Sequence, residues 1–221
     1  MLIDLSHTVE HGMITYKGLP GPVISDHLSR EKSRSVYEAG TEFQIGKIEM
    51  VANTGTYLDS PFHRYSEGKD LSQLPLESLA DLEGVVIRCL ASGSDPSQRE
   101  ISTALGSTNL NNKAVLFNTG WAQHWRTEKY SDGTHPFLSL ATVDVLLKAK
   151  PALVGIDSFN IDNTSTGQRP VHSMLLGAEI PIVEHLCNLD SLPDTNFRFF
   201  AVPVKVKAFG TFPVRAFAVV K

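Results

Sequence analysis

The sequence has little cysteine, no long apolar run and no recognisable leader. Its two cysteines, Cys89 and Cys187, lack the spacing of a redox pair or zinc knuckle, and their apolar neighbours mark them as small core residues. No stretch approaches the roughly 18 apolar residues of a membrane span. The N-terminus has neither the basic nor the apolar region of a signal peptide. We therefore expect a cytoplasmic protein with no membrane partner.

The sequence also lacks a cluster of basic residues. Its net charge is -4, with 20 lysines and arginines against 24 acidic residues. Phosphate backbones are bound by clustered positive charge, so nucleic acid is excluded as a partner. A length of 221 residues with 42% hydrophobic content suits one domain, residues 1–221, with a substantial core.

Hydrophobic periodicity predicts alternating strands and helices, and hence an α/β domain. The predicted strands are 47–52, which alternates like a half-buried strand, 85–90, 114–118, 153–156, 198–206 and 214–220. The predicted helices are 71–82, 97–105 and 140–148. Residues 17–46 contain several Gly and Pro breakers, and we expect an irregular segment that wraps the surface or reaches a neighbouring subunit.

Residues 53–63 contain the densest group of potentially catalytic side chains in the sequence. They read Asn-Thr-Gly-Thr-Tyr-Leu-Asp-Ser-Pro-Phe-His. They place an acid, an imidazole and an aromatic hydroxyl on one short segment, which Gly55 and Pro61 bend. A strand that runs into such a turn can hold a site rigidly and expose it. The alternative is an ordinary turn in which Asp59 and Thr56 bond the local backbone.

This segment resembles the signature of the cyclase family, which includes bacterial kynurenine formamidases and isatin hydrolases. The signature reads His-x-Gly-Thr-His-x-Asp-x-Pro-x-His, and this chain matches it at Gly55, Thr56, Asp59, Pro61 and His63. Asn53 and Tyr57 stand where the family has histidines. The likeness continues in order along nearly the whole chain. It implies a swivelling β/β/α domain, a mixed sheet with flanking helices.

The resemblance also implies a divalent metal ion, zinc or manganese, and no organic cofactor. One family ion is held by positions that correspond to Asp59, His172 and Glu184. The other depends on the two missing histidines, because Asn53 is a weak ligand and Tyr57 a poorer one. One ion, two weakly held ions, a rearranged site and no ion all stay open. Taken singly, Asp59 would be a turn former, His172 a capping or surface histidine, and Glu184 a solvated helix residue.

His63 is the predicted acid/base, because imidazole titrates near neutral pH and transfers protons both ways. Without a metal it would need a carboxylate such as Asp59 or Glu184 to orient it. Tyr57 is expected either to donate a hydrogen bond to substrate or to fill the volume of a lost metal. The predicted substrate contacts are Tyr57, Asn53 and Tyr16. Of these, Tyr16 would form an apolar wall.

The predicted function is hydrolysis of a C–N bond in a small aromatic or carboxylated amide. One alternative is a metal-independent cyclase or dehydratase, and another is a catalytically silent small-molecule binder. The expected partners are a small-molecule substrate and further copies of the chain, in a homodimer or homotetramer.

Overall fold

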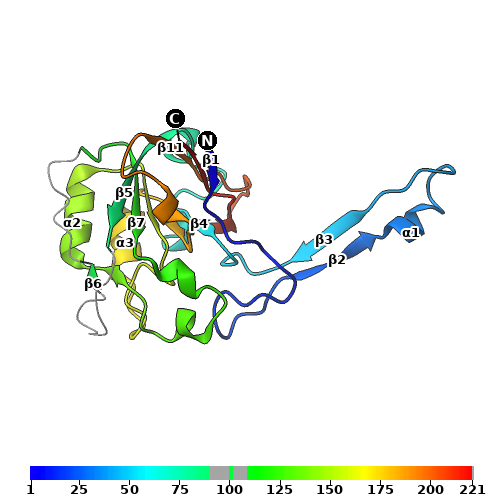
Figure 1. Ribbon diagram of the computed structural model, residues 1–221, viewed down its shortest axis with the longest axis horizontal. Helices are drawn as coiled ribbons and strands as arrows, with labels where there is room; N and C mark the ends of the chain where they lie inside the picture. Colours follow the sequence, from blue (N-terminus) through cyan, green and yellow to red (C-terminus); the bar gives the residue numbers. More distant parts are fainter. Residues whose placement is uncertain (90–99, 102–108, 221) are drawn as a thin grey trace.

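The runs 114–118 and 153–156 are central strands of a nine-stranded mixed sheet (Figure 1), in a computed structural model that describes residues 1–89, 100–101 and 109–220. The strand order is β1-β13-β11-β5-β7-β9-β10-β4-β12. Strands β5, β7, β9 and β10 run parallel, and antiparallel strands flank them on both sides. The predicted α/β class with a mixed sheet is confirmed, whereas the single-domain assignment of 1–221 stays a prediction.

The sheet strands are β1 (Leu2–Asp4), β4 (Tyr57–Asp59), β5 (Leu82–Arg88), β7 (Ala114–Asn118), β9 (Leu153–Ile156), β10 (Ile182–Glu184), β11 (Phe197–Phe200), β12 (Thr211–Pro213) and β13 (Phe217–Val220). A parallel pair, β6 (Glu100–Ile101) and β8 (Phe137–Leu138), lies apart from this sheet. The helices are α1 (Arg30–Ser33), α2 (Leu140–Ala149) and α3 (Pro170–Gly177). Short 3₁₀ turns are η1 (Pro61–His63), η2 (Leu76–Ser78), η4 (Trp121–His124), η5 (Glu128–Ser131) and η6 (Leu189–Ser191).

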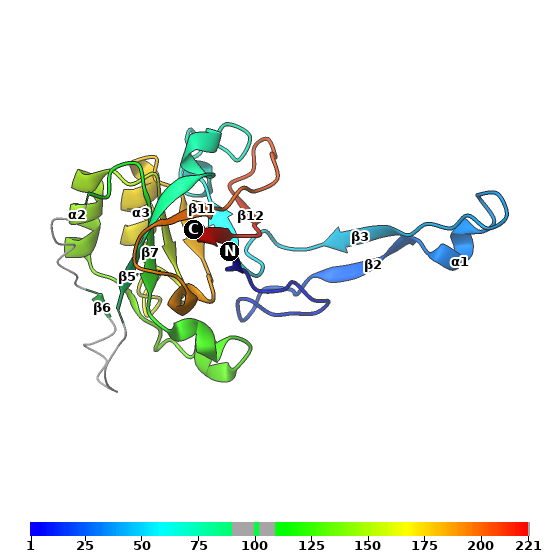
Figure 2. The same cartoon turned by 45° about the horizontal axis from the view of Figure 1, so that its top comes forward.

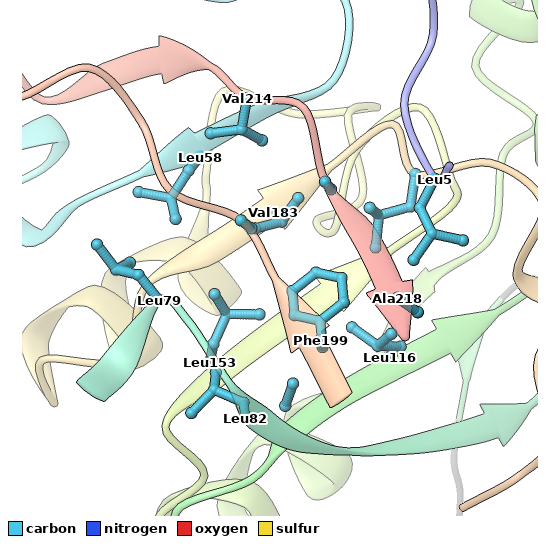
Figure 3. Close-up of a cluster of buried hydrophobic side chains, with 14 of the residues drawn as sticks. Leu5, Leu58, Leu79, Leu82, Leu116, Leu153, Val183, Phe199, Val214 and Ala218 are labelled. Carbon is cyan, nitrogen blue, oxygen red and sulfur yellow. The ribbon is translucent and has the colours of Figure 1, made fainter. Parts of the chain in front are cut away.

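The central strands are buried on both faces, because successive side chains point to opposite sides of a sheet. In β7, Leu116 joins one apolar cluster with Leu58 and Phe199 (Figure 3), while Phe117 joins a second cluster. Helices α2 and α3 cover this second face through residues such as Leu146 and Leu175. A continuous apolar run therefore specifies a central strand here, as the sequence predicted for 114–118 and 153–156.

The predicted helix at 71–82 is wrong. Only η2 is helical in this stretch, and β5 already begins at Leu82. The Asp70 carboxylate accepts the backbone N–H groups of Ser72 and Gln73, which fixes a turn, and Pro75 is extended. The leucine spacing reflects burial of Leu79 and Leu82 in the first cluster rather than a helical face.

Residues 17–46 are not irregular as predicted. They contain β2 (Val23–Leu28), α1 and the first residues of β3 (Ile45–Glu49), and β2 pairs with β3 as an antiparallel hairpin. Figures 1 and 2 show this hairpin and α1 as a long arm that projects from the body of the molecule. The predicted strand at 47–52 is confirmed only for 47–49, which lie in β3, and its half-buried character is wrong, because every residue of β3 is exposed.

The remaining predicted elements are partly corrected. The helix at 97–105 lies mostly outside the described residues, and the two that are described, Glu100–Ile101, form a strand. The strand at 198–206 stops at Phe200, and the one at 214–220 is shortened to β13. The strand at 85–90 begins earlier, at Leu82, and the helix at 140–148 matches α2 closely. Within the described residues, no helix is long and apolar enough to cross a membrane.

Candidate active site

Strand β4 presents two polar side chains on one face. Tyr57 and Asp59 are two residues apart and therefore point the same way, whereas Leu58 points into the core. Strand β4 lies between β10 and β12, with Glu184 directly opposite Tyr57 and Thr211 directly opposite Asp59. This register brings side chains from three distant parts of the sequence together on one small surface.

His172 meets the two acidic residues from helix α3. Its Nε2 lies 3.7 Å from Asp59 Oδ2 and 3.7 Å from Glu184 Oε1. Its Nδ1 lies 2.7 Å from Asp162 Oδ2, which fixes the orientation of the ring. The same Asp162 carboxylate accepts the backbone N–H groups of Val171 and His172 and so caps the start of α3.

These groups carry a buried excess of negative charge. Asp59, Asp162 and Glu184 are fully buried, and His172 is nearly so. Burial alone would lower the pKa of His172, but the carboxylates of Glu184, Asp162 and Asp59 raise it to about 10. Burial, with the Asp59 charge, raises the pKa of Glu184. Three carboxylates face one imidazole ring, and because buried charge must be paired, the cluster attracts a cation or protons.

The cluster fits one divalent ion. The candidate ligand atoms of Asp59, His172 and Glu184 all lie within 4.8 Å of one another. Donor atoms about 3.4 Å apart are expected for tetrahedral coordination at the usual ligand distances near 2.1 Å. Asp59 Oδ2 is buried without a hydrogen-bond partner in the described part of the chain. Asp162 meanwhile occupies Nδ1 of His172 and leaves Nε2 available, as is usual for a metal-ligating histidine.

His63 is joined to the cluster by a threonine. The Thr211 hydroxyl donates to Asp59 Oδ1 and lies 2.8 Å from His63 Nδ1. A hydroxyl has one proton and a carboxylate can only accept, so Nδ1 of His63 must be the donor to Thr211. A neutral His63 therefore carries its proton on Nδ1 and keeps Nε2 unprotonated. That nitrogen is able to accept a proton from a bound molecule.

Gly210 lets His63 come this close. A Cβ at Gly210 would lie 2.5 Å from the His63 backbone nitrogen, a distance that real Cβ atoms do not adopt. The turn η1, which begins at Pro61, ends at His63 and packs directly on this glycine.

Two tyrosines complete the inner wall. The Tyr57 hydroxyl donates to Glu184 Oε2 at 2.6 Å and lies 2.7 Å from the Tyr16 hydroxyl. Burial raises the pKa of both hydroxyls well above the usual value, so both stay neutral. The Tyr16 hydroxyl also lies 3.2 Å from Nε2 of the buried His185, and its ring packs 4.8 Å from the ring of Phe159.

A cavity of about 280 Å³ collects these groups. It is lined by Tyr16, Leu19, Asn53, Tyr57, His63, Arg64, Asn160, Arg169, His172 and Glu184. Every site residue predicted from sequence thus lines it, apart from Asp59, which lies behind the wall within reach of His172. A larger cavity of about 670 Å³ is lined by His7, Trp125 and Asp157 but by none of the candidate metal ligands. Trp125 stacks on His7 and also contacts His185. The His185 ring in turn contacts Tyr16, which lines the smaller cavity.

Sequence reasoning missed several site residues. Thr211 lies far from the recognisable motif and contributes only through its register with Asp59. Arg64, Arg169 and Asn160 line the cavity without any local pattern that marks them. Asp162, which lies outside the motif, caps α3 and also orients His172.

Comparisons with known proteins give a consistent picture. A family model described as "Putative cyclase" matches residues 3–163. A kynurenine formamidase of Bacillus cytotoxicus is 26% identical over 215 residues, which cover 97% of this chain and 95% of the relative. A kynurenine formamidase of Salinibacter ruber is 28% identical over 181 residues, or 81% of each chain.

Solved structures share the whole fold. Isatin hydrolase A of Labrenzia aggregata has a TM-score of 0.80 at 22% identity and covers 100% of this chain and 93% of its own. A structure described as a potential metal-dependent hydrolase with cyclase activity has a TM-score of 0.77 at 21% identity, covering 99% of this chain and 96% of that one. At these identities, the likeness establishes the fold alone.

Proposed function

This chain belongs to the Cyclase family, and from that premise we propose that it hydrolyses a C–N bond in a small aromatic or carboxylated amide. The observation that carries the proposal is the convergence of Asp59, His172 and Glu184, with Asp59 Oδ2 buried and without a hydrogen bond among the described residues. The relatives named kynurenine formamidase support an amide, and the ring of Tyr16 in the cavity wall supports an aromatic substrate.

Asp59, His172 and Glu184 would hold one divalent ion, zinc or manganese. When bound, such an ion lowers the pKa of water and polarises a carbonyl. The two histidines that could hold a second ion in the family are replaced by Asn53 and Tyr57. The Tyr57 hydroxyl donates its proton to Glu184, so it would fix that carboxylate rather than meet the substrate directly.

His63 would act as the acid/base. Its Nε2 is the nitrogen left unprotonated by the link to Thr211, so it would accept a proton from the attacking water. The water oxygen then bonds to the carbonyl carbon. The C–N bond breaks, and the leaving nitrogen takes the proton back from His63. Asp59 would hold Thr211, and through it His63, in the orientation that this transfer needs.

The test is a panel of aryl formamides, lactams and lactones assayed with the wild type and with His63→Gln. We expect release of formate or ring opening by the wild type, and a loss of at least about a hundredfold in the variant, as for other acid/base residues. Activity on lactones or dehydration alone would favour the metal-independent cyclase. Ligand binding without turnover of any member would favour the silent binder.

We also propose that the chain forms a homodimer or homotetramer. The arm exposes a set of apolar side chains, which are Val23, Ile24, Val36, Phe43, Ile45 and Ile48. A second copy of the chain would bury them by two-fold symmetry.

A further inference from the structure

Two arginines stand at the outer part of the 280 Å³ cavity. Arg64 directly follows His63, and Arg169 immediately precedes α3, the helix that carries His172. Both are more exposed than Tyr57, His172 and Glu184, which form the buried inner end. The cavity therefore runs from an acidic floor to a basic mouth.

Both guanidinium groups are held in place without being neutralised. Arg64 Nε donates to Ser173 Oγ at 3.1 Å, and its guanidinium lies 5.1 Å from the centre of the Tyr65 ring. Arg169 Nη1 donates to the backbone carbonyls of Thr166 and Gln168. These acceptors are neutral, so each arginine keeps its full positive charge and several unused N–H donors.

The arginines elsewhere in the described chain are mostly paired. Carboxylates lie within salt-bridge distance of Arg34, Arg88, Arg126, Arg198 and Arg215. Among the described arginines, only Arg30, Arg64 and Arg169 have no such partner. Arg30 lies on the arm, and the other two line one cavity. Two unneutralised guanidinium groups at one cavity mouth are a common means of binding an anion.

The buried carboxylates at the inner end of the cavity determine where an anionic group of a bound molecule can lie. The three buried carboxylates of Asp59, Asp162 and Glu184 carry one charge more than a divalent ion neutralises, so this end of the cavity stays negative, whereas at the mouth a carboxylate would meet two cations. A planar carboxylate also matches the fork of N–H donors that each guanidinium presents. A bound molecule would therefore turn its anionic end outward and its reacting end toward His63.

We propose that Arg64 and Arg169 form a carboxylate subsite, so that the substrate is an aryl amide with an anionic group at the end away from its scissile C–N bond. That the bound molecule is hydrolysed rests on the proposed function. Binding of its carboxylate by the two arginines does not depend on turnover. The aromatic ring would lie between the two ends, against Tyr16, which lines the cavity.

The first test compares para-formamidobenzoate with the neutral para-formamidobenzamide in the wild type, Arg64→Gln and Arg169→Gln. We expect each variant to lower the ratio of kcat/KM for the anionic over the neutral substrate by about tenfold or more, because a charge-assisted bond is lost. The change should fall mainly on KM. Arg30→Gln removes an unpaired arginine from the arm and should leave the ratio unchanged. An unchanged ratio in both cavity variants would overturn the subsite.

A binding measurement separates the subsite from the catalytic proposal. Calorimetry with para-aminobenzoate and para-aminobenzamide should show that the wild type prefers the carboxylate by about tenfold or more, and that Arg64→Gln and Arg169→Gln lose the preference. Arg64→Lys retains the positive charge and should keep part of the preference for the carboxylate. That result would show that a change at this position leaves the protein folded. A wild type that prefers the carboxylate but hydrolyses neither formamide would leave the subsite standing and refute the hydrolase. Equal binding of the two ligands would refute the subsite, whatever the activity.

Discussion

At the residue scale, the side chain most informative to change is Thr211, because its hydroxyl bridges Asp59 and His63 by hydrogen bonds, whereas the direct distance from His63 Nδ1 to Asp59 Oδ1 is 3.7 Å. Thr211→Val keeps the shape of the side chain and removes that connection. We expect kcat/KM to fall by about ten- to a hundredfold, the equivalent of one hydrogen bond to a charged group. Thr211→Ser retains the hydroxyl and should keep most of the activity. A valine variant with wild-type kinetics would show that His63 needs no such orientation.

Tyr57 gives a second prediction at this scale. Tyr57→Phe removes the hydroxyl that donates to Glu184 and leaves the buried ring in place. The remaining partner of Glu184 Oε2 is the Tyr16 hydroxyl, which is longer at 3.3 Å. We expect turnover to drop by about tenfold, because a short charge-assisted bond is lost. Steady-state kinetics decide the question, and unchanged turnover would mean that Tyr57 only fills space.

The sequence indicated the centre of the site better than its surroundings. Asp59 and His63 share one motif, and resemblance located His172 and Glu184. Thr211 could not be found in this way, because its contact with Asp59 depends on which strand lies beside β4 and in what register. Arg64 and Arg169 were missed for a similar reason, since only the folded cavity shows that neither has a carboxylate partner among the described residues.

At the element scale, the packing of η1 on Gly210 is a direct target. Gly210→Ala places a methyl group 2.5 Å from the His63 backbone nitrogen, so η1 must move. We expect a loss of about 1–3 kcal/mol in the free energy of unfolding, as for other overpacked sites, together with a fall in kcat as His63 is displaced. Denaturant unfolding and kinetics measure the two effects. Gly46→Ala on β3 meets no atom within 4 Å and serves as the control.

The elements that could be predicted were those whose pattern reports burial directly. Residues 114–117 and 153–156 contain no polar side chain and form strands buried on both faces. The leucines of 71–82 misled because burial in a turn and burial on a helix can give similar spacing. There the Asp70 side chain takes up backbone donors that a helix would use, and Pro75 is extended.

At the scale of the whole molecule, the arm predicts self-association. Ile24 and Ile48 are cross-strand partners and are 40% and 56% exposed. We expect a dimer or tetramer by light scattering at micromolar concentration. Ile24→Asp combined with Ile48→Asp should shift the protein toward monomer.

The matched control for the arm is the adjacent cross-strand pair. Ser25 and Lys47 lie opposite one another on the other face of the hairpin. The double change Ser25→Asp and Lys47→Asp adds the same side chains there and should leave the oligomer intact. A wild type that is monomeric from the outset would contradict the assembly proposal.

The central claim is that Asp59, His172 and Glu184 hold one catalytic divalent ion, and a titration tests it most directly. Protein stripped by a chelator is titrated with zinc or manganese while the initial rate of aryl formamide hydrolysis is followed. We expect a negligible rate without metal, then a linear rise that stops at one ion per chain, with no rise for His172→Ala. Full activity of the metal-free protein, or a rise that continues to two ions per chain, would contradict it.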